Sequence, residues 1–218
     1  MRLQSAIFDM DGTLLDSMGM WKDLGFHLLE RHGVTPRPDL AEHLKPTGLR
    51  DGVAYCKEAY DLPGTVDELI EECKERVEAF YRNEVQAKPG VEKFLSIMKM
   101  EGVWMYIATA TDRPLVEIAL KHAGIDSFFR GIITSKEAGQ HKKDGPEVYE
   151  RALRRLQSNK KDTVIFEDAV HAVRTAKAAG FRVAAIYDPA AEDDQDEIRA
   201  LADYYYRSFE ELIETQAL

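Results

Sequence analysis

A repeated alternation of amphipathic helices, glycines and apolar runs begins at Lys88 and restricts the fold of this chain more than any other feature. In the first repeat, apolar residues spaced three and four apart over 91–98 predict a helix, Gly102 predicts its end, and the apolar run 103–108 predicts a strand. Helix–glycine–strand units in series are typical of a parallel sheet covered by helices on both faces. The sequence therefore predicts an α/β fold built on a parallel sheet.

The other strands of this sheet are predicted from the same pattern. Apolar runs predict strands at 4–8, 131–134, 163–166, 182–187 and 204–206. Because the strand that follows 4–8 does not begin until 103, a separate segment must be inserted between them. We expect a core formed by residues 1–17 and 87–218, and an inserted domain formed by residues 18–86.

The inserted segment has the residue spacing of a helical domain. Thr65 and Glu68 are spaced as in a capping box, which predicts that a helix begins there. One face of that helix is expected to carry Leu69, Cys73, Val77 and Phe80. A helical module that leaves the core after the first strand and returns before the second is well placed to act as a lid.

The composition argues against several classes of function. The 218 residues carry a formal net charge of -10, which disfavours non-specific binding to nucleic acid or to a membrane surface. No apolar run approaches the ~20 residues that span a bilayer, and no basic stretch followed by an apolar one marks a secretory signal. Cys56 and Cys73 are too few for a disulfide framework. We therefore expect a cytoplasmic protein, and we expect it to be a monomer.

Two aspartates follow the first strand, at the point where a buried apolar run ends. The segment AIFDMDGTLLDS places Asp9 directly after Phe8, and Asp11 two residues later. Two carboxylates at the carboxyl end of a buried strand repel each other and lose water, so a bound cation or a chemical task is needed to explain them. Asp9 is suited to nucleophilic attack on phosphorus, and Asp11 is suited to proton transfer.

A second acidic pair, in the segment VIFEDA, follows the predicted strand at 163–166. Glu167 and Asp168 should reach the same edge of the sheet as Asp9, because parallel strands present their carboxyl ends together. Acidic oxygens from two strands suit a hard cation, and Mg²⁺ fits phosphoryl transfer best. The sequence thus predicts a magnesium site at this edge.

Two further positions are candidates for binding a phosphate group. Thr109 ends the segment WMYIAT, and its hydroxyl and the N–H of Ala110 could hold a phosphate oxygen. Lys143 precedes the Gly-Pro start of a predicted helix, where its charge could neutralise both the phosphate and the carboxylates. Lys142 competes with it, because spacing alone does not separate the two lysines.

These motifs resemble those of the haloacid dehalogenase superfamily in order, spacing and strand context. DMDGT resembles the family's first motif, ATA at 108–110 its second, KDGPEVY its third (K-P-x-P-D-x-F), and FEDA its fourth. The resemblance covers essentially the whole chain, inserted segment included. It implies that Asp9 is the nucleophile, Asp11 the acid/base, Thr109 the phosphate-binding hydroxyl and Lys143 the lysine of the third motif.

The resemblance also implies a Rossmann-like core, a small four-helix-type cap and Mg²⁺-dependent phosphoryl transfer. Asp11 would bind the metal through its backbone carbonyl, beside Asp9, Glu167 and Asp168, and keep its carboxyl for proton transfer. The chain is most similar to the branch that holds beta-phosphoglucomutase and small sugar- or glycolate-phosphate phosphatases. The segment LKPTGLRDG resembles the cap loop of that branch. It has Arg50 at the position of a substrate-contacting arginine.

Two residues depart from the family pattern. Asp144 stands where the family usually has proline after the motif-three lysine, and Ala172 stands where the family often has glycine. Asp144 matters more, because it adds a negative charge beside the phosphate-binding lysine unless its side chain points outward.

Three functions are compatible with these observations. The leading hypothesis is a Mg²⁺-dependent phosphatase that hydrolyses a small phosphorylated metabolite, such as a sugar phosphate, through an aspartyl-phosphate. A hexose-phosphate mutase similar to beta-phosphoglucomutase would use the same intermediate, but Val77 and Glu78 occupy the region where the mutases carry a cap lysine. A non-catalytic phosphate-binding or regulatory protein is the third, although none of the acidic residues that the chemistry needs has been lost.

Overall fold

The computed structural model describes residues 3–44, 48–140 and 143–215. The chain divides into two compact units. Residues 1–16 and 85–218 form the first, which we call the core unit, and residues 17–84 form the second, which we call the helical unit. These bounds lie within two residues of those expected from the sequence.

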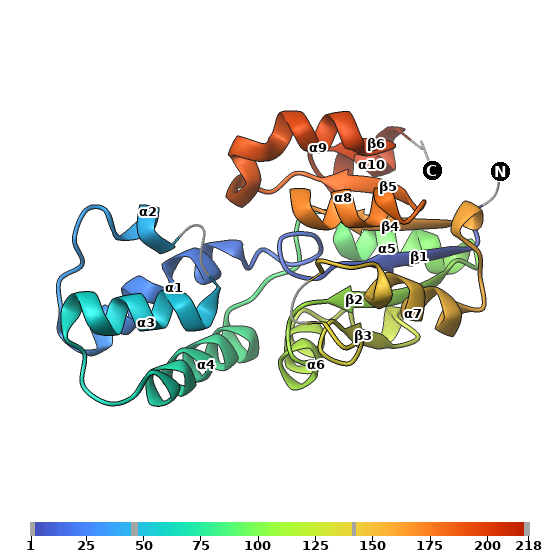
Figure 1. Cartoon of the computed structure of the whole chain (residues 1–218). Helices are drawn as coiled ribbons and strands as arrows, with labels where there is room; N and C mark the ends of the chain where they lie inside the picture. Colours follow the sequence, from blue (N-terminus) through green and yellow to red (C-terminus); the bar gives the residue numbers. More distant parts are fainter. Residues whose placement is uncertain (1–2, 45–47, 141–142, 216–218) are drawn as a thin grey trace. The chain divides into compact units, whose positions relative to one another are not determined.

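The core unit is built on a six-stranded sheet in which every pairing is parallel (Figure 1). Its strands are β1 (Ser5–Phe8), β2 (Trp104–Thr109), β3 (Ile132–Thr134), β4 (Thr163–Glu167), β5 (Arg182–Ile186) and β6 (Tyr204–Tyr206). They lie in the order β3-β2-β1-β4-β5-β6, which is the strand order of a Rossmann-like fold. The predicted α/β fold with a parallel sheet is confirmed.

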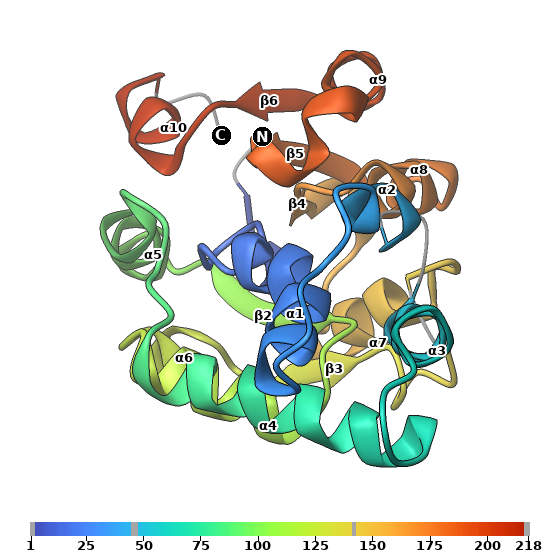
Figure 2. The ribbon, with the colours of Figure 1, turned by 90° about the vertical axis from the view of Figure 1, so that its left-hand side faces the viewer.

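Helices cover both faces of this sheet. They are α5 (Val91–Met100), α6 (Arg113–His122), α7 (Glu147–Leu156), α8 (Val170–Ala178), α9 (Gln195–Leu201) and α10 (Phe209–Thr215), with short 3-10 turns at Asp126–Phe128, Lys160–Asp162 and Pro189–Asp194. Figure 2 shows α5 and α10 on one side of the strands, and α7, α8 and α9 on the other.

Alternating side chains of the central strands divide between the two faces. Phe8 of β1 stacks on Phe166 of β4 with ring centroids 4.4 Å apart, and Phe94 of α5 packs against Phe166 at 5.5 Å. Ile7 and Ile165 point the other way, into the apolar cluster formed with α7 and α8. Both faces are therefore fully covered, as a parallel sheet requires.

The strand order places a switch point beside β1. The chain runs outward from β1 through β2 to β3, and then returns to the other side of β1 as β4. Neighbouring connections thus leave in opposite directions between β1 and β4, so the carboxyl ends of these two strands lie at the switch point. Ligands bind at this position in open α/β sheets.

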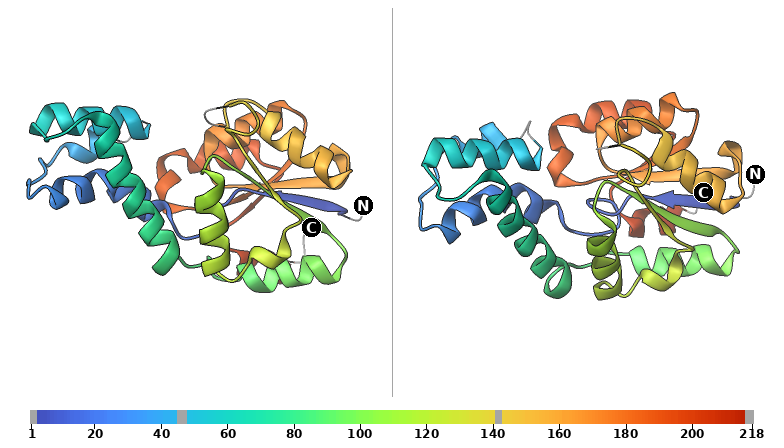
Figure 3. Two further views of the ribbon diagram at one scale, coloured as in Figure 1. Left: turned by 90° about the horizontal axis from the view of Figure 1, so that it is seen from below. Right: turned by 60° about the horizontal axis from the view of Figure 1, so that its bottom comes forward.

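The helical unit, coloured blue to teal in Figure 3, consists of α1 (Met18–Arg31), α2 (Leu40–Leu44), α3 (Leu49–Tyr60) and α4 (Val66–Asn83). The capping box predicted at the start of α4 is present. The Thr65 hydroxyl accepts a hydrogen bond from the Glu68 N–H at 3.2 Å, and Glu68 accepts from the Thr65 N–H at 2.7 Å. This reciprocal pair satisfies two N–H groups that a helix start would otherwise leave unbonded.

The buried face of α4 differs in one residue from the expectation. Leu69, Cys73 and Val77 are buried, but Tyr81 is buried in place of Phe80. Both positions continue the same helical stripe. Tyr81 takes the inner one, where its hydroxyl accepts a hydrogen bond from Trp21 of α1 at 3.1 Å.

Among the described residues, no helix combines the length and the apolar character that crossing a bilayer requires. The cytoplasmic location and the monomeric state stay predictions.

Candidate active site

Asp9 occupies the position directly after β1, at the switch point. Its N–H donates to the Phe166 carbonyl at 3.0 Å, which continues the pairing of β1 with β4 by one residue and holds the side chain in a buried position. The chain then turns sharply at Gly12, whose φ of +82° lies in the left-handed region that favours glycine. This turn brings Thr13 back toward Asp9.

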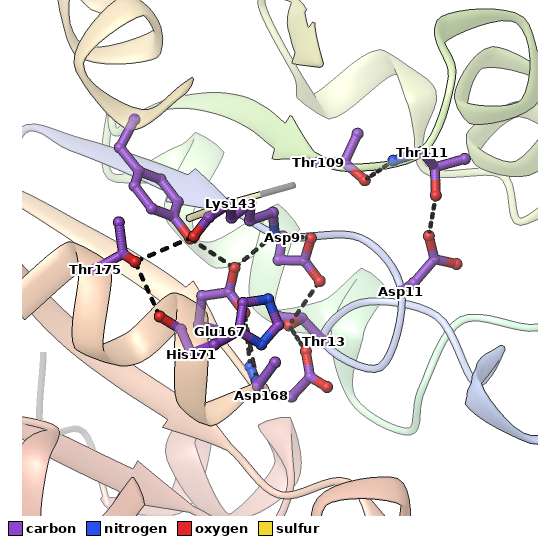
Figure 4. A network of polar contacts seen from close by, with 12 residues as sticks. Asp9, Asp11, Thr13, Thr109, Thr111, Lys143, Glu167, Asp168, His171 and Thr175 are labelled. Carbon is purple, nitrogen blue, oxygen red and sulfur yellow. Dashed lines mark hydrogen bonds and ion pairs between the residues drawn. The ribbon is translucent and has the colours of Figure 1, made fainter. Parts of the chain in front are cut away.

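Lys143 joins the two acidic segments. Its ammonium group, buried on all sides, donates to Asp9 Oδ1 and, at 2.5 Å, to Glu167 Oε1. Figure 4 shows these three side chains facing one another. Lys143 is therefore the lysine that the structure places at the acidic edge, whereas Lys142 lies outside the described residues.

Two further side chains complete this part of the network. The Tyr149 hydroxyl, from α7, donates to Glu167 Oε1 at 2.8 Å. The Thr175 hydroxyl, from α8, lies 3.1 Å from the Lys143 carbonyl oxygen and fixes the backbone that carries the lysine (Figure 4). The contacts to Glu167 and to the Lys143 backbone thus come from α7 and α8, which lie on the same side of the sheet.

Asp168 lies next to Asp9 and is linked to it through Thr13. The Thr13 hydroxyl donates to Asp168 Oδ1 at 2.7 Å and lies 3.4 Å from Asp9 Oδ2. Ligand oxygens of Asp9, Glu167 and Asp168 all lie within 4.8 Å of one another, and all three residues are buried. The structure therefore places the three acidic residues close together at one edge of the sheet, as predicted.

The excess of negative charge perturbs the protonation of these groups. Burial raises the pKa of Asp9 to about 7, against the opposing effect of Lys143. Burial and the charges of Asp9 and Glu167 raise the pKa of Asp168 well above its ordinary value. Burial alone would lower the pKa of Lys143, but the carboxylates of Asp9 and Glu167 raise it, so the lysine stays charged.

The carboxylate cluster fits a divalent cation. It supplies only hard oxygen ligands from two strand ends, and these oxygens are close enough to share one ion. The cluster holds three buried carboxylates and one buried lysine. When all three carboxylates are ionised, their negative charge exceeds the single positive charge of Lys143. Burial is the main cause of the raised pKa values of Asp9 and Asp168, neighbouring carboxylates add to it, and a cation would favour the ionised forms.

The predicted phosphate-binding residues lie at the end of β2, beside β1 in the sheet. Thr109 is the last residue of β2 and is buried, and Ala110 is exposed directly after it. The Thr109 hydroxyl accepts a hydrogen bond from the Thr111 N–H at 3.1 Å. Asp11, on the neighbouring loop, accepts one from the Thr111 hydroxyl at 2.7 Å (Figure 4).

The structure also describes Arg50, the predicted substrate-contacting residue, and Asp144, which departs from the family pattern. Arg50 lies in the helical unit, in the first turn of α3, where its exposed guanidinium pairs with Asp67 of α4. Asp144 is exposed, although it follows the buried Lys143 directly in the chain. Its side chain therefore does not add to the buried carboxylates.

Sequence reasoning assigned no role to Thr13, Thr111, Tyr149 or Thr175. Thr13 lies inside the DMDGT motif, and that was the only signal available for it. Threonines and tyrosines are common in turns and in apolar helix faces, so nothing in their spacing marks a polar contact. Only the folded chain shows that their hydroxyls reach the charged residues.

Comparison with known proteins yields a consistent set of relatives. A family model described as haloacid dehalogenase-like hydrolase matches residues 6–186. The phosphorylated carbohydrates phosphatase of Thermotoga maritima is 25% identical over 178 residues, which cover 82% of this chain and 82% of that protein. Hexitol phosphatase A of Escherichia coli is 30% identical over 193 residues, which cover 87% of this chain and 86% of that protein.

A solved structure of similar sequence shares the fold over nearly the full length. CbbY from Rhodobacter sphaeroides, crystallised in complex with phosphate, superimposes with a TM-score of 0.78 at 25% identity. The match covers 96% of this chain and 96% of that chain.

Proposed function

Because the chain belongs to the haloacid dehalogenase-like hydrolase family, we propose that it is a Mg²⁺-dependent phosphatase that acts through an aspartyl-phosphate on Asp9. The chain lies in the family's phosphoglucomutase- and phosphatase-like branch and is a phosphoric monoester hydrolase. The observation that carries the proposal is the buried cluster of Asp9, Lys143, Glu167 and Asp168 at the switch point of the sheet. Such a cluster can bind a cation and a phosphate together.

The substrate class in this proposal is a small phosphorylated metabolite. Two relatives are named for activity on phosphorylated carbohydrates and on hexitols, and both match more than four fifths of this chain. We extend this class to the present chain as a sugar phosphate or a similar phosphomonoester. Arg50 stays a candidate substrate-contacting residue, on the basis of the family resemblance alone.

Binding of the phosphate group would rearrange one contact in the cluster. Lys143 now donates to Asp9 and Glu167, and it would transfer a hydrogen bond from Asp9 to the incoming phosphate. Thr109 and the N–H of Ala110 would hold further phosphate oxygens at the end of β2. Freed from the lysine, Asp9 would be in position for in-line attack.

The first half-reaction transfers the phosphoryl group to the protein. A carboxylate oxygen of Asp9 forms a bond to phosphorus, and the bond from phosphorus to the leaving oxygen breaks. Asp11 gives its proton to that leaving oxygen, so an alcohol departs and Asp11 becomes ionised. Asp9 then carries the phosphoryl group.

The second half-reaction restores the starting state. Asp11 accepts a proton from a water molecule, whose oxygen forms a bond to the phosphorus. The bond between phosphorus and the Asp9 oxygen breaks, which releases inorganic phosphate and regenerates both side chains. Each residue thus ends in the protonation state in which it began.

The metal in this proposal is held by Asp9, Asp168 and the backbone carbonyl of Asp11, with Glu167 beside them. When bound, Mg²⁺ supplies neutralisation of the negative charge on the phosphate. Two side chains would assist the metal. Lys143 adds a positive charge beside Asp9, and the Thr13 hydroxyl donates to Asp168 and lies near Asp9.

A panel of phosphorylated metabolites tests the proposal. Hexose 1- and 6-phosphates, pentose phosphates and phosphoglycolate are each incubated with the protein and Mg²⁺, with EDTA and the Asp9→Asn variant as controls. We expect phosphate release from at least one substrate, and loss of release in both controls. Conversion of hexose 1-phosphate to the 6-phosphate without release would indicate a mutase. Bound Mg²⁺ without any turnover would indicate a non-catalytic phosphate-binding protein.

A further inference from the structure

Thr111 makes a direct contact with the residue assigned to proton transfer. Its hydroxyl donates a hydrogen bond of 2.7 Å to Asp11 Oδ2, between two loops that are far apart in the sequence. Figure 4 shows the Asp11 carboxylate turned toward Thr111. The contact is partly buried, so water competes for it less than at an open surface.

The position of Thr111 is itself fixed by the turn that follows β2. Its N–H donates to the Thr109 hydroxyl at 3.1 Å, and the Thr109 carbonyl accepts from the Ser135 N–H at 2.8 Å. The turn is therefore fastened to the end of β3. This turn therefore holds two groups: the Thr109 hydroxyl, which is predicted to bind phosphate, and the Asp11 carboxyl, which is predicted to transfer the proton.

Proton transfer depends on such a support. An acid or base must hold its oxygen within hydrogen-bond reach of the leaving group, and a misplacement of about 1 Å can cost on the order of 100-fold in rate. Aspartate has only two side-chain torsions, so one fixed oxygen restricts the whole carboxyl group. A hydroxyl that holds Oδ2 therefore restricts the orientations in which Asp11 can meet the substrate.

We propose that Thr111 is a positioning residue that orients Asp11 for proton transfer to the leaving oxygen. This inference rests on the proposed phosphatase function. Thr111 itself touches Asp11 and Thr109 and takes no part in bond making. Its effect should therefore depend on how strongly a substrate needs the proton.

Leaving-group dependence separates this role from a merely structural one. An alkyl phosphate has a poor leaving group and needs a proton from Asp11, whereas p-nitrophenyl phosphate has a good one and needs it little. In Thr111→Val, which keeps the shape and removes the hydroxyl, we expect kcat/KM for the alkyl phosphate to fall roughly tenfold. For p-nitrophenyl phosphate we expect a change of less than about twofold.

Two further variants complete the experiment. Thr111→Ser retains the hydroxyl and should restore kcat/KM for the alkyl phosphate. Thr215→Val removes a hydroxyl that binds the Leu212 carbonyl in α10, and it should leave both substrates unchanged. Thermal unfolding of all variants identifies any general loss of stability.

An equal fall for both substrates, no fall for either, or failure of Thr111→Ser to restore activity would overturn the inference. These outcomes are distinct from failure of the proposed function. If the wild-type protein with Mg²⁺ releases phosphate from neither of these substrates nor from any member of the panel, the phosphatase itself is refuted. If the wild type hydrolyses both and Thr111→Val does not discriminate between them, only the role of Thr111 is refuted.

Discussion

The carboxylates of Asp9, Glu167 and Asp168 are all buried at the switch point, and the buried ammonium group of Lys143 pairs with two of them, Asp9 and Glu167. Asp9 and Asp168 take up protons more readily than ordinary aspartates, because ionising both would add charge to a site that has little water. A divalent cation and a proton therefore compete for the same oxygens. The competition has a measurable dependence on pH.

Mg²⁺ affinity should fall as the pH is lowered through about 7, the value to which burial raises the pKa of Asp9. Above that pH Asp9 is ionised and can bind the ion, whereas below it a proton must first leave. One proton displaced per ion corresponds to a loss of up to about tenfold in affinity per pH unit. Isothermal titration with MgCl₂ at several pH values from about 6 to about 8 measures the slope. An affinity independent of pH over this range would show that no proton on Asp9 competes with Mg²⁺ there.

Some residues of the site could be predicted from the sequence and others could not. Asp9 and Asp168 were predictable because each follows a buried apolar strand, where a carboxylate is costly without a task. Lys143 was not separable from Lys142 by spacing, and only the folded chain shows that Lys143 is buried beside Asp9. Thr111 was unpredictable, because a hydroxyl in a turn has many ordinary partners.

At the scale of helices and strands, glycines and apolar runs predicted the order of elements in the core unit. The predicted strand at 182–187 and the observed β5, Arg182–Ile186, differ by only one residue. Ends are less predictable because the last pairing of a strand depends on its neighbour rather than on its own sequence. The exchange of Tyr81 for Phe80 in α4 has a similar origin, since spacings of three and four residues from Val77 both continue the stripe and packing selects between them.

The segments that leave and re-enter the core unit are paired with each other. The Asp16 N–H donates to the Gln86 carbonyl at 3.0 Å, and the Lys88 N–H donates to the Leu14 carbonyl at 2.8 Å. The Lys88 side chain then forms an ion pair of 2.8 Å with Asp188, whose side chain is only 2% exposed. This pair fastens the re-entering segment to the end of β5.

Replacement of Lys88 by methionine should destabilise the protein by about 3 kcal/mol, because it leaves the buried Asp188 carboxylate without its partner. The free energy of unfolding from urea denaturation measures the effect. Arg174→Met is the matched control. It breaks the exposed pair with Glu197, and we expect it to cost less than about 1 kcal/mol. Similar losses in the two variants would contradict the account of Lys88.

At the scale of the whole molecule, the core unit is assembled from two separate stretches of chain, residues 1–16 and 85–218. Asp9 comes from the first stretch, and Lys143 and Asp168 come from the second. The fold was predictable because it follows from a repeated local pattern. The substrate was not, because the cluster is proposed to bind only a cation and the phosphate group, and the phosphate group is common to all phosphomonoesters.

The most direct test of the account is to identify the residue that carries the phosphoryl group during turnover. The protein is mixed with a substrate found in the panel and Mg²⁺, quenched in acid within milliseconds, digested, and analysed by mass spectrometry. The account predicts a phosphoryl group on Asp9 that appears before inorganic phosphate and is absent in Asp9→Asn. A phosphoryl group on another residue, or full turnover by Asp9→Asn, would contradict the central claim that Asp9 is the nucleophile.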